Sequence, residues 1–482
     1  MMDARPVLHI LGLLLVALAA LMLVPATVDA VLANGNAGAF AISAILTAMF
    51  GGLTAIATAN SLGASLSVRQ AFLLTVGIWA LLPAFGALPL AFGAPGLGLT
   101  DAYFEAVSGI TTTGATVIVG LDGMPAGTNL WRGMLQWIGG LGIAFIAMIF
   151  LPVMRVGGMQ FFRTEGFDTF GKILPRAPDI ARSLMGVYAG LTVICALVYA
   201  GLGMVPLDAA VHAMASIATG GFSPRDASFN TYRGPGEYAG ALFMILGALP
   251  FVRYVQLVNG QTGPIWRDAQ VRAFLRWLAY AVAAVTLWRL ATSTQSVEGA
   301  FRESLFNLVS IMTSTGFFSG GFGSWDGFPM VVALVIGIVG ACSGSSAAGL
   351  SVFRVQIALL ALAAALRAVT QPNRVAPLRY EGRAIEPDAL DAVIMYIYGF
   401  VFSMGVLTVA MTLTGVDLTS ALFGVWTSLA NIGYGYGPMV AATGTFIEFP
   451  TAAKWLMILA MLMGRLALLS VFVLVLPRFW RP

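Results

Sequence analysis

The chain contains about ten apolar stretches near 20 residues long, and this feature limits its fold more than any other. A helix of that length crosses the roughly 30 Å hydrocarbon core of a bilayer. The stretches lie at about 6–26, 38–60, 70–92, 131–153, 183–204, 237–258, 271–292, 328–370, 389–413 and 451–476. We therefore expect an all-α polytopic membrane protein, multi-pass and embedded in lipid.

Composition supports this expectation, since 59% of the residues are hydrophobic, only 10% are charged and the mean hydropathy is +0.89. A soluble chain of this length needs more charge on its surface. The net charge is +4, and the basic residues are almost all arginines gathered in a few loops, which argues against a nucleic-acid partner. Cys195 and Cys342 lie in separate apolar runs and indicate neither a disulfide framework nor a metal site.

The arginine-rich loops at 155–182, 253–276 and 354–383 alternate with loops such as 93–130 that carry little positive charge. Because cytoplasmic loops carry an excess of Lys and Arg, this pattern places the arginine loops and both termini in the cytoplasm. The N-terminal apolar run exceeds the core of a signal peptide, so it predicts a first membrane helix.

The opposite loops contain a fourfold repeat. Each copy starts near a polar residue, continues for about a dozen amphipathic residues and ends at a cluster of small residues. The copies read TDAYFEAVSGITTTGATV, LDAAVHAMASIATGGFS, RESLFNLVSIMTSTGFFS and LTSALFGVWTSLANIGYGYG. Aligning the glycines at which the motifs turn puts Gly114, Gly220, Gly316 and Gly433 in register.

Each glycine is preceded by a residue type that favours a helix start. The distance is 13 positions for Asp101, Glu303 and Ser420, in the first, third and fourth copies, and 12 positions for Asp208 in the second. Asp417 is an alternative start in the fourth copy. A helix of about three turns cannot cross a bilayer, so it must dip in and return. We expect four helix, pore-helix, helix units around a central pore. The predicted segments are an N-terminal helix pair at 1–66 and repeats at 67–160, 161–262, 263–376 and 377–482.

The stretch ANIGYGYGP, at 430–438, resembles the TVGYG loops whose carbonyl oxygens replace the hydration shell of potassium. Glycine after a pore helix permits the backbone angles that turn carbonyls toward a common axis. The fourth copy carries Ile432 where three copies carry threonine, which favours one well-formed ion site over a series. The predicted filter residues are Thr112, Thr113, Gly114, Ala218, Thr219, Gly220, Ser314, Thr315, Gly316, Asn431, Ile432 and Gly433.

A single Thr-Gly pair in a membrane protein is commonly a packing feature, because small residues let helices approach closely. Four copies on one side of the membrane, each with a polar helix start at about the same distance, favour the filter instead.

The stretch GACSGSSAAG, at 340–349, interrupts the longest apolar run. Irregular backbone at membrane depth is tolerated only where it is buried in protein or lines a cavity. We therefore expect a broken helix with a gate loop, the alternative being an ordinary glycine kink. The predicted gate residues are Cys342, Ser343, Gly344, Ser345, Ser346, Ala347, Ala348 and Gly349.

Arg465 lies about ten residues from each end of the last apolar stretch, too deep for its side chain to reach water easily. An arginine at this depth indicates a functional residue that lines the inner pore, limits leak or pairs with the gate loop. The competing interpretation is a buried structural pair with an acid or a carbonyl.

Enzyme motifs are weak. Residues 344–349 have the glycine spacing of a P-loop without its lysine, and residues 340–344 have that of a nucleophile elbow without a preceding strand. The only two histidines, His9 and His212, have no acid or nucleophile partner that the sequence indicates. The chain is predicted to be neither an enzyme nor dependent on a cofactor.

Four segments in the right order make the chain similar to the TrkH/TrkG/KtrB superfamily of potassium transporters, closer to TrkH: FEAVSGITTTGATV, WRGMLQWIGGLGIAF, GACSGSSAAGLSVFR and MLMGRLALLSVFVLVLPRFW. The resemblance implies potassium selection by the four glycines; related sodium-accepting plant proteins have serine at the first. It also implies a gate at 340–349, an inner-pore role for Arg465 and a location in the bacterial inner membrane. A homodimer and a cytosolic TrkA-like subunit that binds nucleotide or NAD are the implied partners.

The sequence departs from the family pattern at Ser351, where lysine is usual, at Ala467, where an acid is common, and at Ala430, where paired asparagines are common. Two other functions stay open: a sodium-permeable or ion-coupled potassium symporter, and a non-conducting membrane scaffold or receptor. The first is distinguished by whether rubidium flux needs sodium or protons. The second requires that serine at Gly220 or Gly316 leave uptake intact.

Overall fold

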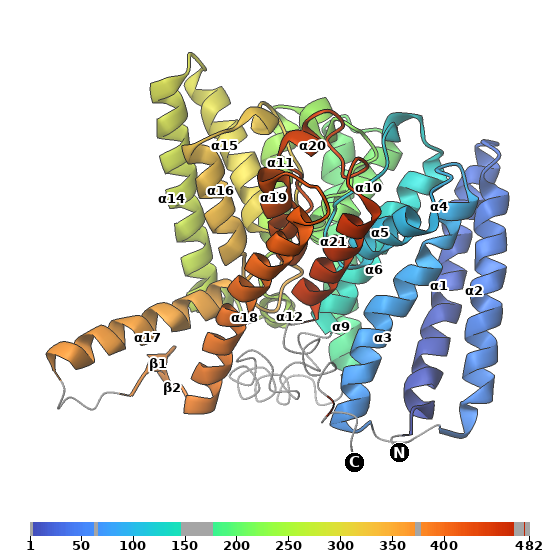
Figure 1. The fold of residues 1–482 in the computed structure, drawn as a ribbon, viewed down its shortest axis with the longest axis horizontal. Helices are drawn as coiled ribbons and strands as arrows, with labels where there is room; N and C mark the ends of the chain where they lie inside the picture. The colour runs from blue at the N-terminus through green and yellow to red at the C-terminus, as the bar shows by residue number, and fades with distance from the viewer. Residues whose placement is uncertain (1–2, 62–65, 146–176, 372–376, 467–476, 478–482) are drawn as a thin grey trace.

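The structure is a computed structural model that describes residues 3–61, 66–145, 177–371, 377–466 and 477 (Figure 1). The described chain is helical except for one hairpin, β1 (Arg379–Tyr380) and β2 (Arg383–Ala384). Within these residues seven helices are long and apolar enough to cross a membrane, or eight if a bent pair counts as one span. The prediction of an all-α polytopic membrane protein is confirmed.

An N-terminal helix pair lies at one end of the molecule (Figure 1) and consists of α1 (Arg5–Val31), α2 (Ala37–Ala57) and the short η1 (Ala59–Ser61). The two helices pack closely because Gly12 and Gly51 face each other. A Cβ on Gly12 would lie 2.7 Å from the Gly51 carbonyl oxygen, so small residues permit the contact.

The buried carboxylate of Asp29 ties this pair to the first repeat. It accepts hydrogen bonds from the Gly127 backbone N–H at 2.6 Å and from the side-chain amides of Asn34 and Asn36 at 2.6 and 2.9 Å. Gly127 lies in the first turn of a helix, where exposed N–H groups favour an anion. A Cβ on Gly127 would overlap this carboxylate, so glycine is required there.

We expect Asp29→Ala to lower the stability of the protein, because it leaves the Gly127 N–H and two amide groups without their acceptor. A buried unsatisfied donor costs about 1–3 kcal/mol. Thermal unfolding in detergent measures the effect, with Asn34→Ala as the control. It removes one of the three hydrogen bonds to the Asp29 carboxylate, and one from the Asn36 N–H, both at an exposed side chain. Equal melting temperatures for Asp29→Ala and the wild type would contradict this role.

The four repeats follow one plan of long helix, short helix and returning helix. The first holds α3 (Val68–Gly86), α4 (Leu88–Phe92), α5 (Leu99–Ile110), η2 (Leu121–Gly123) and α6 (Ala126–Phe145). The second holds α9 (Ala177–Gly201), α10 (Pro206–Ile217), η4 (Ser228–Tyr232), α11 (Pro235–Gly247) and α12 (Phe251–Val258), followed by α13 (Gly263–Arg267).

The third repeat holds α14 (Ala269–Thr292), α15 (Val297–Met312), η5 (Phe322–Ser324), α16 (Phe328–Val339) and α17 (Val352–Thr370). The fourth holds α18 (Pro387–Thr412), α19 (Leu418–Leu429), α20 (Pro438–Ala441) and α21 (Thr451–Arg465). The short helices α5, α10, α15 and α19 gather in one half of the molecule (Figure 1), and their side chains form much of the largest buried apolar cluster.

Three of the short helices have 12 residues, close to the predicted length. The short helix of the third repeat, α15, has 16 residues and begins at Val297. Ser296 caps it by accepting a hydrogen bond from the Gly299 N–H at 3.1 Å. The prediction that Glu303 marks its start is therefore wrong, because Ser296 supplies an earlier cap. In the fourth repeat the alternative start is correct, since Asp417 accepts from the Ser420 N–H at 3.0 Å.

The predicted single span at 237–258 is instead two helices, α11 and α12, bent by 90°. Pro250 precedes α12 and disfavours helical angles at the residue before it, which explains the break. Backbone groups exposed at the bend are used elsewhere: the Phe251 N–H donates to the Gly344 carbonyl at 2.9 Å, and Gly247 accepts from the Ser346 N–H at 3.4 Å. The bend therefore holds the segment between α16 and α17.

The run at 328–370 is broken as predicted, with α16 ending at Val339 and α17 beginning at Val352. In Figure 1, α17 runs sideways from the bundle, with the β1–β2 hairpin beside it. The predicted spans at 131–153 and 451–476 are described only as far as residues 145 and 466. Within those limits α6 and α21 are the helices expected.

Candidate functional site

All four short helices end in the same turn. In each, the N–H three residues after the last helical residue donates to the carbonyl five positions earlier at 2.8 Å: Thr113 to Ser108, Gly220 to Ala215, Thr315 to Ser310 and Ile432 to Thr427. This closing bond is that of the Schellman motif, which reverses the chain at a helix C-terminus. The predicted repeat is thus a repeat of backbone geometry as well as of sequence.

This geometry shifts the register of the second repeat by one residue. The turning glycines in the left-handed region are Gly114, Gly221, Gly316 and Gly433, with φ of +85°, +78°, +83° and +87°. Gly220 occupies instead the position of Thr113, Thr315 and Ile432. With Gly221 in register, Asp208 lies 13 positions before its glycine, as Asp101 does in the first copy. The sequence alignment failed here because Gly220 and Gly221 are adjacent.

The four turns close into a ring. A Cβ on Gly114 would overlap the Gly220 carbonyl oxygen, and one on Gly221 would overlap that of Thr315. A Cβ on Gly316 would overlap the Ile432 carbonyl oxygen, and one on Gly433 would overlap that of Thr113. Each glycine therefore faces a carbonyl of the next repeat, in the order one, two, three, four and back to one. A side chain at any of these glycines would enter the ring.

The residue two positions before each turning glycine also has left-handed backbone angles, although it is not glycine. These residues are Thr112, Thr219, Ser314 and Asn431, with φ between +48° and +58°. Such conformations cost about 1–3 kcal/mol each and persist only where the surroundings impose them. The side chains help to do so. The Ser314 hydroxyl accepts from the Ala348 N–H at 3.1 Å, and the Asn431 amide donates to the Thr113 hydroxyl at 2.8 Å.

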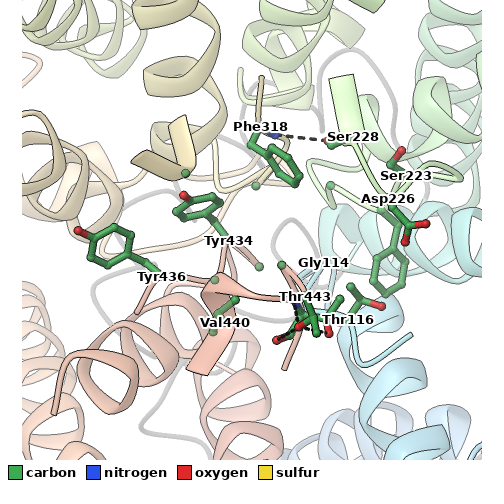
Figure 2. A pocket seen from close by; sticks show the side chains of 18 of the residues that line it. Gly114, Thr116, Ser223, Asp226, Ser228, Phe318, Tyr434, Tyr436, Val440 and Thr443 are labelled. Atoms are coloured by element: carbon green, nitrogen blue, oxygen red, sulfur yellow. Dashed lines mark hydrogen bonds between the residues drawn. The ribbon is translucent and has the colours of Figure 1, made fainter. Parts of the chain in front are cut away.

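A cavity of about 650 Å³ lies on one side of the ring and includes all four turning glycines in its lining. Figure 2 shows segments of all four repeats converging on it, with Thr116, Ser223, Phe318 and Tyr434 at its wall. The cavity opens on the side of the loops that follow the glycines, as an outer vestibule would. We refer to it as the vestibule.

A buried ion pair clamps the chain where it leaves the ring. Glu105 and Arg132 have side chains 0% and 1% exposed and lie 2.8 Å apart. The Glu105 carboxylate also accepts from the Val117 N–H at 2.9 Å, and Arg132 donates to the Ser223 carbonyl at 2.9 Å. This ion pair therefore joins the segments that follow the filter turns of the first two repeats. Sequence analysis did not identify it.

Two of the acids predicted at the starts of the short helices, Asp101 and Asp208, lie in the first helical turn and also take part in ion pairs that connect the repeats. Asp101 in the first repeat pairs with Lys454 in the fourth at 2.7 Å. Arg225 pairs with Asp208 at 2.7 Å and with Asp122 of the first repeat at 3.1 Å. Only the helix-start role was visible in the sequence, because the basic partners lie far away along the chain.

The predicted gate residues lie between α16 and α17, in an irregular segment that runs from Gly340 to Ser351. Besides its contacts at the bend of the second repeat, the Ser343 N–H donates to the Gln270 side chain at 2.9 Å. The Ala348 N–H reaches Ser314, which directly precedes the ring residue Thr315. The segment is therefore attached to the underside of the ring, opposite the vestibule.

Arg465 joins this segment to the ring. Its guanidinium donates to the Ser346 carbonyl at 3.0 Å, and also to the Thr111 carbonyl and the Thr112 hydroxyl. Gly464 lets α21 approach closely, since a Cβ there would overlap the Leu429 carbonyl. These three partners of Arg465 are uncharged oxygens. Arg465 is therefore paired with oxygens of the predicted filter residue Thr112, the predicted gate residue Ser346 and Thr111, which precedes the filter.

Ser351 accepts from Arg354 at 3.2 Å and from Ser343 at 3.0 Å. Ser351, where the family pattern has lysine, therefore takes part in the hydrogen bonds of the segment between α16 and α17. Ala467 and most of the predicted connection at 155–182 lie outside the described residues. His212 lies in the second short helix, where its Nε2 is 3.1 Å from the Ser223 hydroxyl among aromatic rings, which suits a packing role.

Comparisons with known proteins agree over almost the whole chain. The model of the TrkH family, described as cation transport protein, matches residues 37–481. The chain is 39% identical to the Trk system potassium uptake protein TrkI of Halomonas elongata, over 99% of this chain and 97% of that protein. It is 34% identical to TrkH of Escherichia coli over the full length of both. The crystal structure of the potassium transporter TrkH from Vibrio parahaemolyticus matches all of both chains with a TM-score of 0.91 at 32% identity.

Internal repeats that meet around one axis in a polytopic membrane protein are typical of transport proteins. The site agrees, since the ring is built from glycines and backbone carbonyl oxygens. The chain belongs to the TrkH family of cation transport proteins. Membership of this family confirms the prediction that the chain is not an enzyme.

Proposed function

We propose that this protein takes up potassium across the bacterial inner membrane through the ring of four filter loops. The ion is the transported substrate, and the relatives named above are potassium uptake proteins. The membrane potential supplies about 2.3 kcal/mol per charge per 100 mV, so uptake against a gradient needs no ATP hydrolysis by this chain.

The observation that carries the proposal is the closed ring of glycines and carbonyls. The oxygens of Thr113, Gly220, Thr315 and Ile432 lie at equivalent positions of the four loops. Carbonyl oxygens are the ligands that replace the water shell of potassium. The C-terminal ends of four short helices also point toward this ring, and their partial negative charge favours a cation. One ring of this kind supports a single well-formed ion site.

The segment between α16 and α17 acts as the gate in this proposal. It lies under the ring and is held by Ser314, by the bend of the second repeat and by Arg465. These contacts are few and mostly uncharged, so a modest conformational energy from a cytosolic partner can release them. We propose a homodimer regulated by a TrkA-like subunit that binds nucleotide or NAD, with both termini in the cytoplasm.

Growth and ion flux in bacteria lacking their own potassium uptake test the proposal. Cells that produce this protein and its regulatory subunit are expected to grow at low potassium and to take up rubidium. Rubidium uptake that continues without sodium and without a proton gradient supports a channel-like pathway, while dependence on either ion supports a symporter. No rescue, with the protein verified in the membrane, would refute potassium uptake.

A further inference from the structure

The side chain of Gln136 on α6 lies behind the filter loop of the second repeat. It is fully buried, and its amide nitrogen donates to the Gly220 carbonyl. Its amide oxygen accepts from the Phe222 N–H at 3.0 Å. One side chain thus holds the residues on both sides of the turning glycine Gly221.

Gln136 also fills the space that a side chain takes in the other repeats. The residues equivalent to Gly220 are Thr113, Thr315 and Ile432. The two threonine hydroxyls each bind a threonine two positions earlier, at 2.7 and 2.8 Å, and so brace their own loops. A Cβ on Gly220 would lie 2.6 Å from the Gln136 amide oxygen and 2.9 Å from its Cγ.

Gly220 does not need to be glycine for its backbone angles, because its φ lies outside the left-handed region. The steric reason is Gln136. A second residue on the same face of α6, Arg132, donates to the Ser223 carbonyl. The filter turn of the second repeat is therefore held at Gly220, Phe222 and Ser223 by α6, a helix that belongs to the first repeat.

We propose that Gln136 is a positioning residue that sets ion selectivity through the Gly220 carbonyl. It replaces, from a neighbouring helix, the brace that the first and third repeats build from their own threonines. Because its amide donates to this carbonyl, the oxygen has less negative charge free for a cation than the other three carbonyls. The four carbonyls of the ring are therefore not equivalent, and the Gln136–Gly220 hydrogen bond is one source of the difference, beside the Ile432 of the fourth loop. This inference rests on the proposed filter function.

The test is a double-mutant cycle with rubidium uptake and sodium permeation as readouts. Gln136→Ala is expected to reduce the preference for rubidium over sodium by about threefold to tenfold, the effect of one lost hydrogen bond. Gly220→Thr collides with Gln136 and is expected to reduce rubidium uptake by more than about tenfold. The double variant removes the collision but not the need for a brace, because Ala218 stands where the first and third loops have the partner threonines Thr111 and Thr313. Rubidium uptake is therefore expected to recover relative to Gly220→Thr, while the ion preference stays as low as in Gln136→Ala.

Selectivity is the decisive readout, because a residue that only stabilises the fold would change the amount of protein and leave the ion preference unaltered. If Gly220→Thr alone fails to fold, the double variant must recover folded protein by size-exclusion chromatography. A Gln136→Ala protein with wild-type ion preference, or a double variant no better than Gly220→Thr, overturns the inference. Gly316→Ala distinguishes failure of the proposed filter from failure of the proposed role of Gln136. Unchanged rubidium uptake in Gly316→Ala refutes the filter, whereas lost uptake leaves only the role of Gln136 in question.

Discussion

Gly316→Ala is expected to reduce rubidium uptake by more than about tenfold. With φ of +83°, an alanine at this position costs about 1–2 kcal/mol in backbone strain alone. Its Cβ would also overlap the Ile432 carbonyl oxygen, which belongs to the proposed ion ring. The loop must move to relieve the overlap, and displacement of a carbonyl removes a ligand from the ion. Since about 1.4 kcal/mol corresponds to tenfold, even partial displacement exceeds that factor.

Gly203→Ala is the matched control. Gly203 has a similar φ of +95°, but a Cβ there would meet nothing within 4 Å, so it carries the backbone strain without the collision. Uptake and expression are measured for both variants in the same cells. If both lose uptake equally, backbone strain and not the ring is responsible. If Gly316→Ala transports as well as Gly203→Ala, the ring is not the ion path.

The fourfold plan was predictable from the sequence because each unit repeats a local pattern. Short helices followed by glycine turns depend on residues within one segment, and the structure has α5, α10 and α19 close to the predicted bounds. The predicted start of the third short helix was wrong because Ser296 caps that helix about two turns before Glu303. Sequence analysis chose Glu303 by its distance from the turning glycine and did not consider Ser296, which lies outside that repeat spacing.

The one-residue error at Gly220 has a different origin. Two adjacent glycines fit the motif equally well, and the choice between them is made by Gln136, which lies 84 positions away in the chain. The same limit applies to the pairing of Asp101 with Lys454 and of Glu105 with Arg132. The sequence shows that these residues are charged, but which residue each one pairs with is determined only when the repeats close around one axis.

The bend between α11 and α12 shows how two weak signals combine in three dimensions. Pro250 alone suggests a kink, and the glycine-rich segment at 340–349 alone suggests a break. In the structure the unpaired backbone groups of one meet those of the other, at Gly247 with Ser346 and at Phe251 with Gly344. Each irregularity is tolerated inside the membrane because the other satisfies it.

Replacing Arg465 is expected to have the opposite effect on flux to replacing a ring glycine. Its guanidinium bridges the Ser346 carbonyl, in the proposed gate, to Thr111 and Thr112 beneath the ring. Hydrogen bonds to a charged group contribute about 1.5–3 kcal/mol each. Arg465→Ala removes this bridge and leaves the segment held by Ser314 and the bend of the second repeat. We expect rubidium flux without the regulatory subunit to rise by about tenfold or more.

Arg354→Ala is the control, because Arg354 also donates to this segment, but at its α17 end, to the Leu350 carbonyl and the Ser351 hydroxyl. Flux is measured in vesicles that contain the purified protein alone, with sodium as a second ion to detect loss of selectivity. A rise in rubidium flux with selectivity retained identifies Arg465 as a latch between gate and filter. A rise in both ions assigns it instead to the shape of the ring, and unchanged flux removes it from gating altogether.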